Sequence, residues 1–465
     1  MPPRPLLQTW FAGCFLGLLL TTGPSVLHTA DSTANAASCP RIQDPQYVDL
    51  CAGVDPQFGA VRMLRMKRPA QFEAVTDPTF GTTIRRITDS GPDEITKPVY
   101  STIQAWNADE SYFVLYFQPG DGDGEHHLYD GNTYRFVRKL DIQPADLEEV
   151  FWHTTDPDTL FYAESYYRKL HKYSVADDAS TPWMDFTKVC PKGNDLVSGG
   201  DVHMPSWDNK YMGFRCGGYN DSAAKTYIVD LQDRTLLSVA TSGIGDGDDH
   251  PEGYDAYSAP MPGPSGNTFF YQGDVLDVKQ RKLRSLAIKK EEHSSIGRLP
   301  DGSDAFFAVG FVDAPDKRCG GSIGQVVAHN LETGDCFIAL GPEQGIDYPA
   351  TSTHHSALAR AAPGWVASSS VGETGRGLIG SYQKMPGQEI YLTYTDKQNP
   401  QHCRVAHHRS FGKDNEQVDI PYFAEPHVTI SPSGTRLLFG SDWHGDNRVD
   451  TYVIELPIHA TCAGQ

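Results

Sequence analysis

The sequence predicts an all-β protein that folds as a single seven-bladed β-propeller with a short irregular N-terminal extension. Three observations predict it: a strand-turn-strand unit recurs seven times, several copies precede a second hairpin, and long helical periodicity is nearly absent. Successive turns lie roughly 35 to 70 residues apart, which brackets the spacing of about 40 to 50 residues expected for four-stranded blades. We therefore expect one repeat domain rather than the several domains that length alone suggests.

The repeated unit is an apolar strand start, a turn carrying Asp, Asn, Ser, Pro or Gly, and a strongly apolar or aromatic strand. These turn residues permit the tight reversal that joins two antiparallel strands. The seven copies span residues 103–118, 150–164, 203–216, 258–273, 295–310, 355–370 and 427–442. Second hairpins follow at residues 127–137, 226–239, 275–286 and 325–340. One short helical turn is expected at residues 144–150.

The two ends of the repeat region predict how the ring closes. Residues 72–88 contain two strand-like runs upstream of the first copy, and residues 449–456 form a strand at the other end. N-terminal strands that complete the last blade would leave no free sheet edge. We expect a signal peptide at residues 1–37, an irregular extension at 38–70 and the propeller at 71–465.

The first residues predict export. Arg4 precedes an apolar run at residues 10–20, and a polar stretch then ends in Ala34-Asn35-Ala36. This order is typical of a secretory signal peptide, cleaved after Ala36 or Ala37. The apolar run is about half of the roughly 20 residues that a membrane span needs. We expect a secreted or periplasmic protein with no membrane span.

The cysteines support the same compartment. Cleavage removes Cys14 and leaves an even number of cysteines, which in an exported chain predicts up to four disulfides. Counting leaves the connectivity open, and local pairs are the simplest guess. These pairs are Cys39 with Cys51, Cys190 with Cys216, and Cys319 with Cys336.

The charge of the chain excludes some classes of partner. The formal net charge is -20, and no long Lys/Arg cluster occurs. Nucleic-acid binding relies on positive charge that displaces counterions, so nucleic acid is not expected as a partner. An anionic membrane surface is disfavoured as a partner for the same reason. We also expect the protein to be a monomer.

One copy of the repeat carries a resemblance to a known family. Residues 427–442 read HVTISPSGTRLLFGSD, which resembles the TolB-like propeller repeat, roughly F-S-P-D-G-x-x-[IL]-x-F-x-S. Proteins with such repeats include peptidase propellers, periplasmic binding propellers, and polysaccharide lyases such as the oligogalacturonate and ulvan lyases. The resemblance implies about seven blades and leaves the activity open. No residue-by-residue motif of the lyases is found.

Histidines recur where the innermost strand of a blade is expected to start. These histidines are His153, His203, His293, His354, His355 and His427. A propeller directs such positions toward the mouth of its central channel, where imidazoles from distant copies could hold a divalent metal. Any single histidine can equally hold neighbouring strands together. We predict His203, His293, His355 and His427 as ligands of Mn, Ca or Zn.

Carboxylates could join this site. The nearby candidates are Asp201, Asp248, Asp249 and Glu425, which would suit Ca or Mn. Two acidic loops, residues 121–125 and 245–255, lack the full EF-hand spacing and also fit plain solvated turns. His407 and His408 come late in a blade and are expected to be exposed.

A lyase reading suggests catalytic residues. Oligogalacturonate lyases, which the chain resembles in architecture, use a histidine-bound metal to neutralise the substrate carboxylate while a base removes the neighbouring proton. Such a reaction needs a base, an acid and a cation. The candidates are His250, Tyr254, Tyr257 and Arg215. Both tyrosines also fit a core position or a wall of the channel.

A possible serine-hydrolase motif and several tryptophans suggest other functions. Residues 320–324 read GGSIG, which matches the G-x-S-x-G elbow of serine hydrolases. An elbow joins a strand to a helix, however, and here a strand-like run follows, so a flexible loop is expected. Aromatic side chains could stack on sugar rings or wedge between blades. Those near inner strands are Trp106, Trp152, Trp207 and Trp443.

Two hypotheses of different classes survive. The first is a secreted carbohydrate-active enzyme, lyase-like, that acts on uronic-acid-containing polysaccharide or oligosaccharide through a histidine-rich channel site with a divalent metal. The second is a non-catalytic extracellular binding propeller. The repeated placement of histidines favours the enzyme, whereas the acidity of the chain favours the binding protein.

Overall fold

The chain divides into two compact units, residues 1–36 and 37–465. A computed structural model describes parts of the second unit, and the description below concerns these residues alone. They are residues 39–41, 45, 47–55, 59, 61–164, 167–192, 194, 196–198, 203–217, 223–241, 258–287, 293–309, 319, 325–341, 353–370, 382–383, 388–412 and 420–462. The proposed signal peptide lies outside them, and the proposed domain boundaries stay a prediction.

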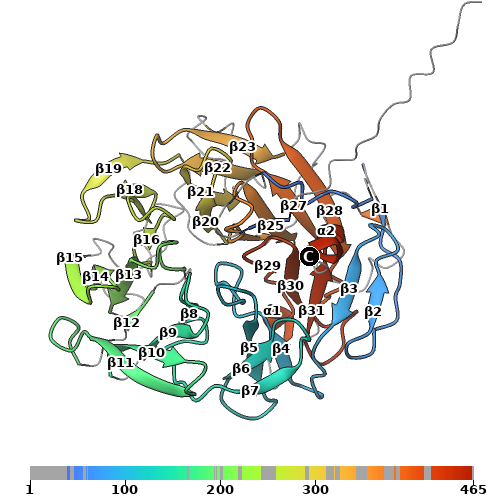
Figure 1. Ribbon diagram of the computed structural model, residues 1–465, viewed down its shortest axis with the longest axis horizontal. Helices are drawn as coiled ribbons and strands as arrows, with labels where there is room; N and C mark the ends of the chain where they lie inside the picture. The colour runs from blue at the N-terminus through green and yellow to red at the C-terminus, as the bar shows by residue number, and fades with distance from the viewer. Residues whose placement is uncertain are drawn as a thin grey trace, which may run out of the picture. The chain divides into compact units, whose positions relative to one another are not determined.

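Seven antiparallel sheets form a ring, so the fold is a seven-bladed β-propeller (Figure 1). Blades 1 to 3 contain β4 (Ile95–Lys97), β5 (Tyr112–Gln118), β6 (Glu125–Asp130) and β7 (Phe136–Lys139); β8 (Val150–Trp152), β9 (Thr159–Glu164), β10 (Lys169–Ser174) and β11 (Ala179–Asp185); and β12 (Leu196–Val197), β13 (Tyr211–Cys216), β14 (Lys225–Asp230) and β15 (Thr235–Thr241). Blades 4 to 6 contain β16 (Met261–Pro262), β17 (Phe269–Tyr271), β18 (Asp274–Leu276) and β19 (Lys282–Ser285); β20 (Ser295–Arg298), β21 (Asp304–Val309), β22 (Val326–Asn330) and β23 (Cys336–Leu340); and β24 (Thr353–Ser356), β25 (Trp365–Ser370), β27 (Glu389–Tyr394) and β28 (Gln401–His407).

Burial distinguishes the innermost strands from the outermost ones. The first strand of a blade lines the channel and is buried, as β4 and β8 are throughout. The second strand is packed between neighbouring blades, and every residue of β21 is buried. The fourth strand β15 faces solvent, and its residues are exposed or half-buried. The apolar second strand of each repeat is therefore the core of its blade.

The seventh blade closes the ring with strands from both ends of the repeat region. Its order is β2 (Ala74–Thr76), β3 (Thr83–Arg86), β31 (Asp450–Glu455), β30 (Arg436–Ser441) and β29 (Thr429–Ile430). Ile84 of β3 lies opposite Ile454 of β31. The expected closure by the N-terminal strands is confirmed. Five of the seven predicted copies contain residues of both strands of a blade's first hairpin. The copies at 103–118 and 203–216 contain the second strand but begin after the innermost strands β4 and β12, so His203 follows an innermost strand instead of starting one.

The structure corrects one predicted disulfide. Cys39 pairs with Cys462 and Cys51 with Cys403, so the expected bond between Cys39 and Cys51 is wrong. The N-terminal segment is bonded to blade 6 and to the C-terminal helix instead of folding on itself. Two local pairs are confirmed, Cys190 with Cys216 and Cys319 with Cys336.

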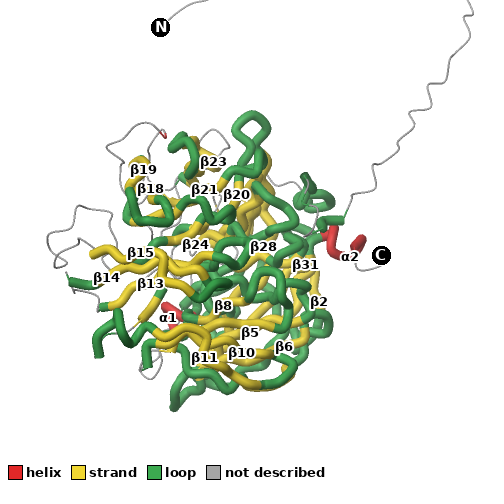
Figure 2. Tube along the Cα trace, turned by 60° about the vertical axis from the view of Figure 1, so that its left-hand side comes forward, coloured by secondary structure: helices red, strands yellow, loops and turns green. Residues whose placement is uncertain are grey.

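Helix is scarce in the described residues (Figure 2). The two helices are α1 (Ile420–Phe423) and α2 (Pro457–Cys462), and residues 144–150 form a turn rather than helix. A further strand pair joins β1 (Val61–Arg62) to β26 (Tyr382–Gln383). Among the described residues, no helix has the length and apolar character that a membrane crossing requires.

His407 and His408 are fully buried, so their expected exposure is wrong. The end of β28 is covered because the turn between β2 and β3 of blade 7 packs on it, with the His407 amide 3.4 Å from the Asp77 carboxylate. His408 Nε2 lies 2.8 Å from the Ser370 carbonyl oxygen. An outer strand of blade 6 is thus buried by the β2–β3 turn of blade 7.

Candidate metal centre

The innermost strands of a propeller run in the same direction around the channel, so their first residues meet at one mouth. Blade 6 brings His354, the second residue of β24, to this mouth. Blade 7 brings Glu425 and His427, which immediately precede β29. Strand β24 contacts both β20 and β29, so residues from blades 5, 6 and 7 lie side by side.

Glu425 lies between two histidines. Its Oε2 is 3.5 Å from His354 Nε2 and 3.4 Å from His427 Nε2. Both imidazoles are almost fully buried, whereas the Glu425 side chain is 20% exposed. These separations exceed the usual 2.7 to 3.2 Å of N–H···O hydrogen bonds, but ligands of one metal ion lie roughly 3 to 4 Å apart. The triad therefore fits a shared cation.

Unsatisfied nitrogens support this fit. Within the described chain, His354 Nδ1 and both ring nitrogens of His427 are buried and make no hydrogen bond. Buried polar atoms are normally hydrogen-bonded, so each exception needs an explanation. An ion held by the imidazoles and the Glu425 carboxylate would account for these atoms. The residues present thus suit a divalent metal.

Aromatic rings pack around the triad. The His293 ring stacks on His354 with centroids 4.1 Å apart and an interplanar angle of 15°. The Tyr100 ring meets His427 edge-on at 4.9 Å and His354 at 5.7 Å. Tyr422 of α1 approaches His427 at 5.8 Å. These contacts hold the imidazoles in place, so little reorganisation would be needed for a metal to bind.

Two of the histidines have a left-handed backbone, with φ of 43° at His427 and 62° at His293. Outside glycine this conformation is uncommon, and strained positions of this kind cluster at functional sites. Each residue stands just before an innermost strand. The strained turn places the side chain at the mouth before the strand begins.

The electrostatics keep the imidazoles neutral. Burial lowers the pKa of His354 and His427 well below 6.5, and the neighbouring His293 and Lys97 lower it further. Neutral imidazole is the form that binds metals. Lys97 of β4 is 2% exposed, and burial lowers its pKa to about 7, opposed by Glu425 and Glu148. Its Nζ donates to the Glu425 carbonyl oxygen at 2.9 Å.

The structure brings some of the predicted ligands together. His293 and His427 join the cluster, but His354 rather than His355 faces Glu425. Successive side chains of a strand point to opposite faces, and His355 Nδ1 lies 2.7 Å from Ser368 Oγ. Burial lowers the pKa of His355 to about 3. Metal binding by any of these residues stays a prediction.

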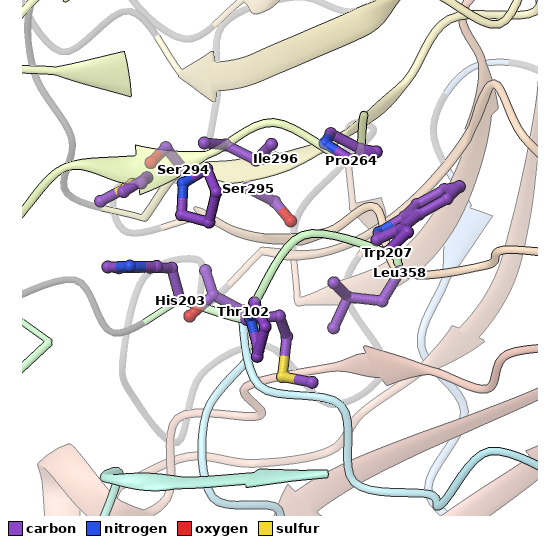
Figure 3. A pocket seen from close by; sticks show the side chains of 12 residues that line it. Thr102, His203, Trp207, Pro264, Ser294, Ser295, Ile296 and Leu358 are labelled. Atoms are coloured by element: carbon purple, nitrogen blue, oxygen red, sulfur yellow. The ribbon is translucent and has the colours of Figure 1, made fainter. Parts of the chain in front are cut away.

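His203 lines a separate cavity of about 380 Å³ (Figure 3). Thr102, Ser294 and Ser295 line the same cavity, with Trp207 and Leu358 on the side away from His203. The described residues do not place His203 in the group with His354 and Glu425. A second group, Cys319, His329 and Cys336, has its two sulfurs in a disulfide.

The predicted catalytic residues are mostly outside the described chain. His250, Tyr254 and Tyr257 lie outside it, as do Asp201, Asp248, Asp249 and residues 320–324. Arg215 is described and almost fully buried in β13. It lies opposite Val197 of β12, an innermost strand, at the end of the blade where the metal centre is. Its catalytic role stays a prediction.

Two residues of the site were missed by the sequence reasoning, Lys97 and Tyr100. A lysine inside the buried strand Ile95–Lys97 was an available signal, because lysine is almost never fully buried without a partner. Tyr100 gave no comparable signal. Among the tryptophans, Trp106 and Trp443 are buried in the core, and Trp443 stacks on Tyr452 at 4.7 Å.

Two solved structures share this fold. "Oligogalacturonate lyase in complex with manganese" is 17% identical with a TM-score of 0.56, over 86% of this chain and 100% of that chain. An oligogalacturonate lyase from Vibrio parahaemolyticus is 14% identical with a TM-score of 0.55, over 86% of this chain and 99% of that chain. At these identities the likeness shows the fold alone. Neither a protein family model nor a curated protein matches the chain.

Proposed function

We propose that the protein is a metal-assisted lyase that acts on uronic-acid-containing polysaccharide or oligosaccharide. The observation that carries the proposal is the convergence of His354, His427 and Glu425 from two blades on one channel mouth. Neutral imidazoles with a carboxylate suit manganese, and also zinc or calcium to differing degrees. The fold likeness to a manganese-bound oligogalacturonate lyase supports the same class of reaction.

The proposed chemistry is elimination beside a carboxylate. When bound, the metal supplies positive charge that neutralises the uronate carboxylate and acidifies the proton on C5. A base takes this proton, the C–H electron pair becomes the C4–C5 double bond, and the C4–O bond breaks. An acid protonates the departing oxygen. We propose His250, Tyr254 and Tyr257 as the base and acid, with Arg215 as a cation for the carboxylate.

Local positive charge makes an anionic substrate compatible with an acidic chain. The formal net charge is -20, which repels polyanions at long range. Lys97 Nζ, however, lies against the Glu425 backbone at the metal centre. A lysine and a divalent cation at one mouth would reverse the field there. We propose that Lys97 acts through this field and not by contact with the substrate, because it is 2% exposed.

We also propose that the chain is secreted or periplasmic, with residues 1–37 as its signal peptide. Four disulfides support this compartment because such bonds persist in oxidising surroundings. A uronic-acid polysaccharide would be met outside the cytoplasm. Activity and compartment are thus mutually consistent.

The test is an absorbance assay for unsaturated uronides on a panel of acidic polysaccharides, with manganese and with a chelator. We expect activity that the chelator abolishes and that His427→Ala removes. His171→Ala is a matched control, because His171 Nε2 also lies close to a carboxylate, Glu164 Oε2 at 2.8 Å, but in β10. A folded, manganese-treated protein that is inert on every substrate would favour a non-catalytic binding propeller.

A further inference from the structure

We infer that the far end of the channel holds a second ligand site, for a small carboxylate whose body has a flat face, and that Arg360 binds its charge. Arg360 follows His354 by six residues along the innermost chain of blade 6. Strand β24 ends at Ser356, and none of His354, Glu425 and His427 lines the cavity that Arg360 lines. The site is therefore separate from the metal centre and does not rest on the proposed function.

A cavity of about 300 Å³ surrounds this end of the channel. Trp152 and His153 contribute from blade 2, Trp207 from blade 3, and Leu358 and Arg360 from blade 6. This space includes the open mouth of the cavity, so a bound ligand would lie partly outside it. Trp207 and Leu358 also line the cavity of Figure 3, on the side away from His203. The cavity therefore offers apolar walls to one face of a small ring.

Arg360 is a buried cation without a carboxylate. It is 9% exposed, and its Nη1 donates to the Thr154 carbonyl oxygen. In the part of the chain that the structure describes, its Nε and Nη2 make no hydrogen bond and no ion pair forms. Burial lowers its pKa to about 10, opposed by Glu110. Glu110 is itself bonded to Arg436, with Nη2 and Oε2 2.6 Å apart.

Nε and Nη2 of Arg360 reach solvent, so an anion in the cavity could bind both of them without displacing a protein partner. Guanidinium presents a planar fork that matches a carboxylate in geometry. The donors of Arg360 that remain, Nε and Nη2, lie on one edge of this fork. A bidentate carboxylate is the ligand group that they fit.

His153 supplies a further donor. Its Nδ1 accepts hydrogen bonds from the backbone amides of Asp156 at 3.0 Å and Thr155 at 3.2 Å. The neutral ring must then carry its proton on Nε2. Within the described residues this N–H has no hydrogen-bond partner, and His153 lines the cavity. Burial lowers the pKa of His153, so the ring stays neutral and donates from Nε2.

The walls suit a flat ligand. Trp152 is held by a hydrogen bond of 2.8 Å from its Nε1 to the Ala105 carbonyl oxygen. Trp207 is half-buried, and the Arg298 guanidinium packs 5.1 Å from its ring centroid. Indole faces stack on pyranose and aromatic rings alike. Two sources of the same chemistry are thus compatible with the cavity, an acidic monosaccharide and an aromatic carboxylate.

The test is isothermal titration of the full chain in chelator with galacturonate, benzoate and neutral galactose. We expect saturable binding of at least one acid and none of galactose. Arg360→Met should weaken binding roughly ten- to a hundredfold, the usual loss for hydrogen bonds to a charged group. Arg234→Met is the matched control, because Arg234 also packs on a tryptophan, Trp183, but neither residue lines the cavity. The affinity of this variant for the acid should be unchanged.

Each outcome decides the inference. Binding of galacturonate identifies an acidic sugar, and binding of benzoate alone identifies an aromatic acid. Failure of both acids overturns the site. Melting curves establish that Arg360→Met folds, and His153→Phe, which retains a ring but loses the donor, should also weaken binding. If His427→Ala abolishes acid binding while Arg360→Met leaves it intact, the acid binds at the metal centre and the inference is wrong.

Discussion

Replacing Cys51 and Cys403 together by alanine is expected to lower the free energy of unfolding by about 4 kcal/mol. The two cysteines are 352 residues apart, so their bond alone would close a very long loop. The bond between Cys39 and Cys462 already joins the ends of the described chain. With that bond present, the additional loop consists of residues 39–51 and 403–462, about 70 residues, and loop entropy then gives this magnitude.

The same reasoning ranks two disulfides. Cys190 and Cys216 are 26 residues apart, so their removal should cost about 3.5 kcal/mol, less than the loss of Cys51–Cys403. Guanidinium titrations of the oxidised variants, monitored by tryptophan fluorescence, measure both changes. Non-reducing peptide mapping is the control for the pairing. A Cys39–Cys51 peptide, or an unchanged unfolding midpoint without Cys51 and Cys403, would refute this account of how the N-terminal segment is bonded.

Three further perturbations test the site and the packing. Glu425→Gln retains the shape of the side chain but removes the charge between His354 and His427. Manganese affinity in a dye-competition assay should fall at least roughly tenfold, because even changes to residues behind the metal ligands cost this much. Equal affinity would show that the carboxylate is no ligand. Burial lowers the pKa of His126 to about 4, so the stability that its neutral ring contributes above pH 6.5 is lost as the pH falls toward 4. His126→Gln should therefore reduce the acid-induced drop in unfolding free energy by about 3 kcal/mol. An equal drop in the variant and the wild-type protein would contradict this prediction. Gly213→Ala would place a methyl group against the Pro260 carbonyl oxygen of the next blade. The free energy of unfolding should therefore fall by about 1 to 3 kcal/mol. A melting temperature equal to that of the wild-type protein would show that the blades are less tightly packed.

The fold was predictable because its signals are local. Each blade repeats an apolar strand, a turn and a second apolar strand, and the seven turns can be found without knowing any contact. Closure by residues 72–88 followed from an unpaired strand at each end of the repeats. The pairing of Cys39 with Cys462 was not predictable. It depends on where ring closure brings the two ends, which spacing along the chain does not encode.

The sequence predicted which strands carry the candidate site, but not which residue of each strand faces it. The repeat placed His354 and His355 at the same innermost strand. Which of them faces the channel depends on the register of the strand, because a shift of the pairing by one residue turns every side chain to the opposite face of the sheet. His407 and His408 illustrate a second limit. The end of β28 is covered by the β2–β3 turn of blade 7, a contact distant in sequence.

The most direct test of the central claim is a manganese titration of chelator-treated protein followed by electron paramagnetic resonance. The account predicts one manganese ion bound per chain, with binding lost in His354→Ala and His427→Ala and retained in His171→Ala. Absence of bound manganese in the folded wild-type protein, or equal binding in all three variants, would contradict a metal centre at His354, Glu425 and His427.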